Sequence, residues 1–310
     1  MRTAFVFPGQ GAQKVGMGQS LIEACAAAKA VFEQADEALG MRLSSLCFEG
    51  PEEELRLTEN TQPAILATSI AALRCLEARG VRADFVAGHS LGEYSALVAA
   101  GALRFEDALR VVRQRGQFMQ EAVPAGEGAM AALLGTDVET VEALCREAAE
   151  RGVCSPANLN SPNQVVIAGH KSAVEYAVTL AKQRGVRRAV MLAVSAPFHC
   201  ALMQPAAERL QPVLAETVFA DLHLPLITNV DAAIITSGDE ARAALVRQVA
   251  SPVRWSESVK RLLDEGVTRF IELGPGKVLS GLIKQIGPEA QILNVEDAPS
   301  LEATAASVGF

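Results

Sequence analysis

Residues 83–93 read Ala-Asp-Phe-Val-Ala-Gly-His-Ser-Leu-Gly-Glu, and this stretch decides the fold expected for the chain. Residues 83–87 have the short apolar pattern of a buried strand, which Gly88 ends. Gly88 to Gly92 then matches G-x-S-x-G, the sharp strand-to-helix turn that lifts a serine hydroxyl clear of a sheet. A helix beginning near Leu91 would point its free N–H groups at the same place. Ser90 is therefore a candidate nucleophile, and the alternative is an ordinary tight turn.

The segments on either side of this turn alternate between strand and helix patterns. Residues 3–7 are apolar and rich in strand formers, and residues 65–79 have apolar residues at helical spacing before Gly80. After residue 199 we expect a helix ending near 216, a strand at 226–229, a helix ending at 249, a strand at 269–273 and a helix at 278–286. Such alternation predicts a largely parallel sheet with helices on both faces.

The middle of the chain has a different pattern. We expect strands at 129–134, 153–158, 164–168 and 188–194, and helices at 138–151 and 173–184. The order β-α-β-β-α-β is that of a ferredoxin-like unit. The predicted fold is an α/β core of residues 1–125 and 196–310, interrupted by a ferredoxin-like subdomain of residues 126–195.

The bulk composition excludes several classes of protein. Half of the 310 residues are hydrophobic and the net charge is -8, so we expect a large core and no nucleic-acid partner. We expect no export signal or membrane anchor, because no segment approaches the roughly 18 apolar residues that span a bilayer. The six cysteines lack C-x-x-C spacing, so we expect reduced thiols and a cytoplasmic protein. No metal site is predicted.

A serine nucleophile needs a base, because an alcohol reacts poorly near neutral pH, and histidine has the suitable pKa. Four histidines are available. His89 is expected to pack behind the turn, and His170 and His223 are expected to lie in loops. His199, where the chain re-enters the core, is by elimination the best candidate.

One arginine lies where an apolar residue is expected. On the helix predicted for 105–121, Arg115 belongs to the stripe that also contains Ala108, Val112 and Met119. A buried guanidinium is unfavourable unless an anion meets it, and the neighbouring Gly116 costs about 1 kcal/mol in a helix unless close approach requires it. Arg115 is therefore predicted to bind an anionic group. A structural ion pair or a snorkelling side chain is the alternative.

Several motifs occur together in a fixed order. They are residues 7–11 (Phe-Pro-Gly-Gln-Gly), 88–93, 115–120 (Arg-Gly-Gln-Phe-Met-Gln), 158–169, 195–199 (Ser-Ala-Pro-Phe-His) and 248–255. In these motifs, and over nearly its whole length, the chain closely resembles the malonyl-CoA:acyl carrier protein transacylases of bacterial fatty acid synthesis. The resemblance implies an α/β-hydrolase-like core with a ferredoxin-like insertion.

The resemblance also implies roles for the candidate residues. Ser90 would be the acylated nucleophile, His199 its base and Arg115 the ligand of the malonyl carboxylate. The malonyl group would pass from malonyl-CoA to the phosphopantetheine thiol of an acyl carrier protein, with CoA as product and no permanently bound cofactor.

Further residues would support this reaction. The backbone N–H groups of Gln10 and Leu91 would form the oxyanion hole, and the main-chain carbonyl of Gln248 would orient the histidine. Met119 and Phe198 are expected to contact the substrate, and Phe198 would crowd an α-methyl group and so favour malonyl over methylmalonyl.

Acyl carrier proteins are acidic, so this acidic chain needs a local basic dock. The segment 171–199 carries one acidic residue, Glu175, and five basic ones, which are Lys171, Lys182, Arg184, Arg187 and Arg188. This segment would meet the carrier or the phosphates of coenzyme A, and a solvated basic face is the alternative interpretation.

Three other functions fit parts of the sequence. A serine esterase or thioesterase commonly carries a His-Gly-Gly-Gly-type motif, which is absent, and would leave Arg115 unexplained. A non-catalytic docking subunit would need neither the turn nor this arginine. A freestanding acyltransferase serving a polyketide synthase is a further alternative that is compatible with the same residues. Because the first and last predicted elements lie near the termini, a module of a larger polypeptide is not expected.

Overall fold

A six-stranded sheet forms the centre of the larger part of the molecule. The computed structural model describes residues 1–194 and 196–309, and in it the strand order of this sheet is β10-β9-β1-β2-β7-β8. All neighbouring strands are parallel except the β7–β8 pair. The strands are β1 (Arg2–Phe7), β2 (Phe85–Gly88), β7 (Leu226–Ile227), β8 (Ile234–Ile235), β9 (Val267–Leu273) and β10 (Gln291–Val295).

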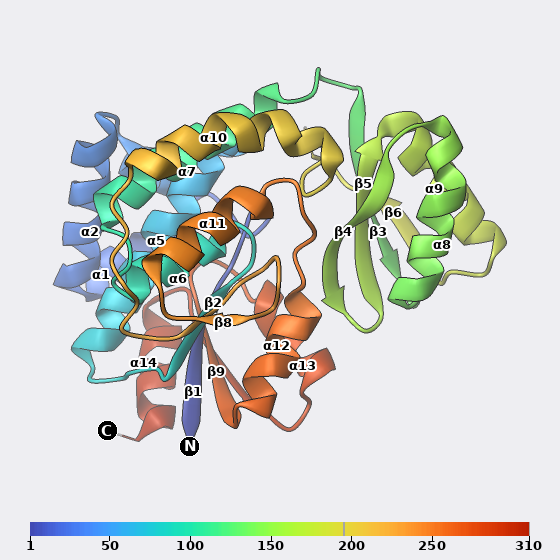
Figure 1. Ribbon diagram of the computed structural model, residues 1–310. Coiled ribbons are helices and arrows are strands. Elements are labelled where there is room, and N and C mark those ends of the chain that lie inside the picture. The colour runs from blue at the N-terminus through green and yellow to red at the C-terminus, as the bar shows by residue number, and fades with distance from the viewer. Residues whose placement is uncertain (195, 310) are drawn as a thin grey trace.

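Alternate residues of the central strand β1 face two separate hydrophobic clusters. Phe5 and Phe7 pack into the cluster formed with α2, α5, α6 and α7, whereas Ala4 and Val6 pack against α12 and α13. Because strand side chains alternate between faces, both sides of this sheet are buried beneath helices (Figure 1). The helices of this part are α1 (Gln19–Ala24), α2 (Ala26–Leu39), α3 (Leu43–Glu49), α4 (Glu52–Leu55), α5 (Thr58–Ala78), α6 (Gly92–Ala99), α7 (Phe105–Glu121), η2 (Ala201–Met203), α10 (Gln204–Glu216), α11 (Gly238–Gln248), α12 (Trp255–Asp264), α13 (Val278–Ile286) and α14 (Ala298–Val308).

A second, antiparallel sheet lies beside the first and is called here the small sheet. Its strands β3 (Gly128–Leu134), β4 (Cys154–Ser161), β5 (Gln164–His170) and β6 (Arg188–Met191) have the order β4-β5-β3-β6. Helices α8 (Val138–Ala148) and α9 (Lys171–Gln183) pack on one of its faces, and the short η1 (Ala149–Arg151) follows α8 (Figure 1). This β-α-β-β-α-β order, together with the mostly parallel larger sheet, confirms the predicted fold class.

The small sheet is joined to the core by backbone hydrogen bonds. The N–H of Leu159 in β4 donates to the carbonyl of Val253 (2.8 Å), and the N–H of Val253 donates to Ala157 (2.9 Å). The segment between α11 and α12 is therefore paired with the small sheet.

Some element boundaries differ from the prediction. The predicted strand 226–229 ends at Ile227, and the predicted helix 65–79 begins at Thr58, with Pro63 inside it. The strand predicted for 188–194 ends at Met191. Ser195, the predicted last residue of the subdomain 126–195, lies outside the described residues, and the boundary at 195/196 stays a prediction.

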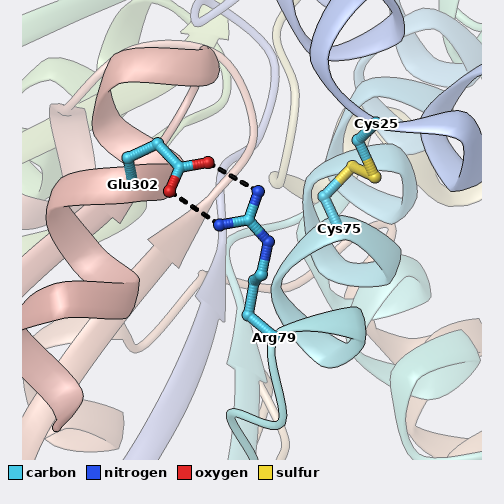
Figure 2. Close-up of a disulfide and its surroundings, with 4 residues drawn as sticks. All are labelled: Cys25, Cys75, Arg79 and Glu302. Carbon is cyan, nitrogen blue, oxygen red and sulfur yellow. Dashed lines mark hydrogen bonds and ion pairs between the residues drawn. A yellow bond between two sulfur atoms is a disulfide. The ribbon is translucent and has the colours of Figure 1, made fainter. Parts of the chain in front are cut away.

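The prediction of six reduced thiols is wrong. Cys25 and Cys75 form a disulfide, with Cα atoms 6.0 Å apart, whereas Cys47, Cys145, Cys154 and Cys200 are free (Figure 2). Cys25 separates α1 from α2, and Cys75 lies in α5, on which α2 packs. The pairing depends on this helix packing, which the spacing of cysteines along the chain does not reveal.

The helix α5 is also tied to the last helix of the chain. Arg79, which follows α5, donates from both terminal nitrogens to the Glu302 carboxylate of α14, at 2.7 and 2.5 Å (Figure 2). Both side chains are exposed, so this pair contributes little to stability. Among the helices of residues 1–194 and 196–309, none combines the length and apolar character needed to cross a membrane.

We predict that opening the disulfide lowers the free energy of unfolding by about 4 kcal/mol, because it releases a closed loop of 50 residues in the unfolded chain. Urea unfolding with and without reductant measures this difference. The double variant Cys25→Ser/Cys75→Ser should match the reduced protein and should not respond to reductant. Equal unfolding midpoints for the oxidised and reduced protein would contradict the expectation.

Candidate active site

Ser90 is held in an unusual backbone conformation between β2 and α6. Its φ is +53°, in the left-handed region that non-glycine residues rarely adopt. The flanking glycines are required by close approach: a Cβ on Gly88 would collide with the backbone of Gly92, and a Cβ on Gly92 would collide with the carbonyl of Phe7. The predicted strand-to-helix turn is therefore present, packed tightly against the end of β1.

His199 is the histidine that contacts Ser90. The Ser90 hydroxyl lies 2.7 Å from Nε2 of His199, and Nδ1 lies 2.9 Å from the main-chain carbonyl oxygen of Gln248. A carbonyl can only accept, so the ring proton sits on Nδ1 and leaves the Nε2 lone pair free to take the serine proton. No carboxylate is needed to orient this ring.

Burial keeps the His199 imidazole neutral. Its side chain is 3% exposed, and burial, together with the positive charge of Arg115, lowers its pKa to about 3. A neutral imidazole is the form that acts as a general base. The base is therefore already in its active, deprotonated form near neutral pH.

Arg115 is almost fully buried beside the nucleophile. It is 1% exposed, and its Nη2 donates to the Ser90 hydroxyl oxygen at 3.1 Å. Its other acceptors are neutral amide oxygens, those of Gln62 and Gln248, both at 2.8 Å. Within residues 1–194 and 196–309 no carboxylate lies within 4.0 Å of this guanidinium, which argues against the structural ion pair.

The glycine that follows Arg115 has a packing reason. A Cβ on Gly116 would lie 2.7 Å from the Cα of Glu59 and 2.7 Å from the carbonyl oxygen of Thr58. The backbone of helix α7 thus contacts the backbone at the start of α5. This contact brings Arg115 of α7 next to Gln62, which also lies in α5.

Two backbone N–H groups are free near Ser90. In the described part of the chain neither the N–H of Gln10 nor that of Leu91 has a hydrogen-bond partner. Leu91 follows the serine directly. Gln10 is brought close because the preceding Gly9 packs against the carbonyl of His89 so tightly that a Cβ there would collide with it. These two donors suit an oxyanion.

The side chains of the three other histidines, all of them described in the structure, make their contacts elsewhere than at the Ser90 hydroxyl. His89 packs behind the turn, where its Nε2 lies 2.8 Å from the side-chain oxygen of Asn160 and its ring lies beside Trp255. His170 ends β5 and accepts from a backbone N–H, and His223 is an exposed loop residue. The interpretation of His89 as a packed residue is therefore confirmed.

The two predicted substrate contacts lie near the site. Met119 is buried in α7, and its sulfur accepts from Nε2 of Gln62 at 3.8 Å, the same amide whose oxygen binds Arg115. Phe198 is buried directly before His199. A cavity of about 520 Å³ adjoins His199 between the small sheet and the core, a size that suits a small-molecule ligand.

The sequence reasoning missed Asn229. Its side-chain oxygen accepts from the N–H of Ser90 and its amide donates to the carbonyl of Gly88, both at 2.6 Å. It therefore holds both sides of the turn. A signal existed: Asn229 closes the predicted strand 226–229, and residues at the carboxyl ends of neighbouring parallel strands gather at one edge. Gln62, inside a long helix, carries no such signal.

The site has the means to hold an acyl group on serine, because it combines an activated hydroxyl, a neutral base and free donors at a nucleophile turn. In the described residues, no group of three or more His, Cys, Asp or Glu is placed to hold a metal ion. An enzyme built on this fold and site is a serine acyl-transfer enzyme.

The chain belongs to the acyl transferase family: the family model described as "Acyl transferase domain" matches residues 4–303. It is 53% identical to the malonyl CoA-acyl carrier protein transacylase of Bacillus subtilis, over 97% of this chain and 95% of the relative. The solved structure of the malonyl CoA-acyl carrier protein transacylase of Coxiella burnetii has a TM-score of 0.98 and 43% identity, covering 100% and 98% of the two chains. A malonyl-transacylase solved in complex with a type II PKS acyl-carrier protein has a TM-score of 0.97 and 46% identity, covering 99% and 100%.

We predict that acylation of Ser90 by a neutral acyl thioester is independent of pH between about 5 and about 8, because His199 stays deprotonated there. Rapid-quench mass measurements at each pH give the rate. A rise in rate centred near the ordinary histidine pKa of about 6.5 would show that His199 titrates normally and that burial does not lower its pKa.

Proposed function

We propose that this chain transfers a malonyl group from malonyl-CoA to the phosphopantetheine thiol of an acyl carrier protein, through an ester on Ser90. The observation that carries the proposal is the Arg115 guanidinium, buried 3.1 Å from the Ser90 hydroxyl with no carboxylate partner among the described residues. Such a cation is a receptor for an acyl group that carries its own carboxylate. The names of the similar transacylases support the same substrates.

In the first half-reaction, Ser90 attacks the thioester carbonyl while His199 takes its proton at Nε2. The N–H groups of Gln10 and Leu91 donate to the developing oxyanion, and each such donor is typically worth about 2.7 to 4 kcal/mol. The tetrahedral intermediate then expels CoA as its thiol, which receives the proton held by His199. The products are CoA and malonyl-Ser90.

In the second half-reaction, the carrier's thiol attacks the malonyl-serine ester. His199 accepts the thiol proton and returns it to the Ser90 oxygen as the ester bond breaks. The enzyme is regenerated, and the malonyl group leaves on the carrier. No resident cofactor enters either step.

Arg115 selects the acyl group. In the unloaded site it is held by the amide oxygens of Gln62 and Gln248, and a malonyl carboxylate can accept from its remaining terminal N–H groups as a charged, bidentate acceptor. An acetyl group offers no such acceptor. Met119 and Phe198 would line the acyl pocket, where Phe198 disfavours an α-methyl substituent.

The carrier protein would dock on the basic segment 171–199. Its five basic side chains, Lys171, Lys182, Arg184, Arg187 and Arg188, are all exposed. One of them, Arg184, is paired with Glu147. A cytoplasmic location is part of this proposal. The four free thiols support it, because free thiols are typical of a reducing compartment. The Cys25–Cys75 disulfide is not typical of such a compartment.

A carrier of polyketide synthesis is the second candidate acceptor. The similar malonyl-transacylase with a TM-score of 0.97 was solved with a type II PKS acyl-carrier protein, and its chemistry would be the same. Measuring the rate of malonyl transfer to a carrier of fatty acid synthesis and to a carrier of polyketide synthesis distinguishes the two candidate acceptors. An esterase is disfavoured because it would not need Arg115.

We predict that malonyl-CoA alone, without any carrier, leaves a malonyl adduct on Ser90, because both half-reactions share one covalent intermediate. Intact mass and peptide mapping after rapid quench detect it. Ser90→Ala should abolish the adduct, and His199→Ala should slow its formation by about 10²- to 10⁴-fold. An unmodified protein, or an adduct on the nearby Cys200, would overturn the mechanism.

The variant Arg115→Ala should lower kcat/KM for malonyl-CoA by about two to three orders of magnitude, because breaking a desolvated charge pair costs about 3 to 5 kcal/mol. Its activity toward acetyl-CoA should rise relative to malonyl-CoA, since the pocket then holds no unpaired cation. Arg110→Ala, an exposed arginine on the same helix, is the matched control and should change neither value. Equal losses for both substrates in Arg115→Ala would mean a purely structural role.

A further inference from the structure

A buried carboxylate lies beside the site and has no part in the mechanism above. Glu93, the second residue of α6, is 1% exposed. Its Oε2 accepts from Nε2 of Gln248 at 2.7 Å and from the N–H of Asn229 at 3.2 Å. In the described residues no cationic group lies within 4.0 Å of it, so a direct ion pair does not explain its burial.

Gln248 connects this carboxylate to the reacting groups. Its Nε2 also donates to the carbonyl of Ser90 (3.0 Å), its Oε1 accepts from Arg115 (2.8 Å), and its main-chain carbonyl binds His199. The side-chain amide has a donor end and an acceptor end. Glu93 as a carboxylate can only accept, so it holds the NH₂ end and turns the oxygen toward the guanidinium.

We propose that Glu93 is a positioning residue which fixes the Gln248 amide and thereby aims Arg115 at the acyl group on Ser90, so that Glu93 sets the preference for carboxylate-bearing acyl groups. The inference rests on the function proposed above. If the Gln248 amide turned over, its NH₂ would face the Arg115 guanidinium, and two donors would oppose each other. The guanidinium would then lose one of its two amide acceptors and its fixed direction.

The charges around Glu93 predict how this preference depends on pH. Burial raises the pKa of Glu93 to about 7, against the opposing effects of Gln248, Asn229 and Arg115. The other ionisable groups that act on it are Asp231, Arg247 and the neighbouring Tyr94. As pH falls through about 7 the carboxyl gains a proton and stops being a pure acceptor. The preference for malonyl should therefore be full above this pH and weaken below it.

The test compares kcat/KM for malonyl-CoA and acetyl-CoA in the full-length wild type and in Glu93→Gln, which keeps the shape but can offer an NH₂ to Gln248. We expect the malonyl-to-acetyl ratio of kcat/KM to fall by about tenfold, an effect of the size that loss of a hydrogen bond to a charged group produces. The value of kcat/KM for acetyl-CoA should be almost unchanged. In the wild type the ratio should rise with pH through about 7, and in Glu93→Gln it should be flat.

Two further variants make the test specific. Glu272→Gln removes another fully buried carboxylate, which accepts from the backbone at the start of α13, and should leave the ratio unchanged. Gln248→Met keeps the main-chain carbonyl that binds His199 but lacks the amide, so it should lower the ratio as Glu93→Gln does. The double variant Glu93→Gln/Gln248→Met should lose no more than either single variant.

The inference is overturned if Glu93→Gln keeps the wild-type malonyl-to-acetyl ratio of kcat/KM. It is also overturned if Glu93→Gln lowers kcat/KM for both substrates by the same factor, since Glu93 would then only support the turn. Should Glu93→Gln not fold, the wild-type pH profile and Gln248→Met decide in the same way. Failure of the proposed function looks different: the wild type would then form no malonyl-Ser90 at all.

Discussion

The buried positive charge of Arg115 constrains every group around Ser90. A guanidinium removed from water must be solvated by protein, and here the two amide oxygens of Gln62 and Gln248 and the serine hydroxyl do so. The same charge helps to keep His199 neutral. The nucleophile, the base and the acyl selector are thus electrostatically linked, and none can be altered without changing the environment of the others.

The position of the site follows from the sheet. Three adjacent parallel strands, β1, β2 and β7, end at one edge, and the residues just beyond them are Gln10, Ser90 and Asn229. Parallel strands present their carboxyl ends together, so segments far apart in sequence supply one site. The close backbone contacts of Gly88 and Gly92 then hold Ser90 in its left-handed conformation. A less tightly packed turn would allow Ser90 to return to a common backbone conformation.

Local patterns in the sequence predicted part of this arrangement. The turn at Ser90, the apolar stripe that includes Arg115 and the bounds of α7 at 105–121 were readable, because each depends on a few neighbouring residues. Gln62 and Glu93 were not, since their importance comes from contacts between different helices and loops. The Cys25–Cys75 pair was missed for the same reason. No helix was predicted between residues 19 and 55, where three of the four helices have only 6, 7 and 4 residues.

The pairing of β4 with the segment after α11 has a mechanical consequence. Leu159 and Val253 share a backbone hydrogen bond, and Asn160 of the same strand binds His89 beside the nucleophile. Swinging the small sheet outward would break both contacts and disturb the segment that carries the Gln248 carbonyl. The small sheet is thus held against the core by these hydrogen bonds, and any outward displacement of it would be opposed by their loss.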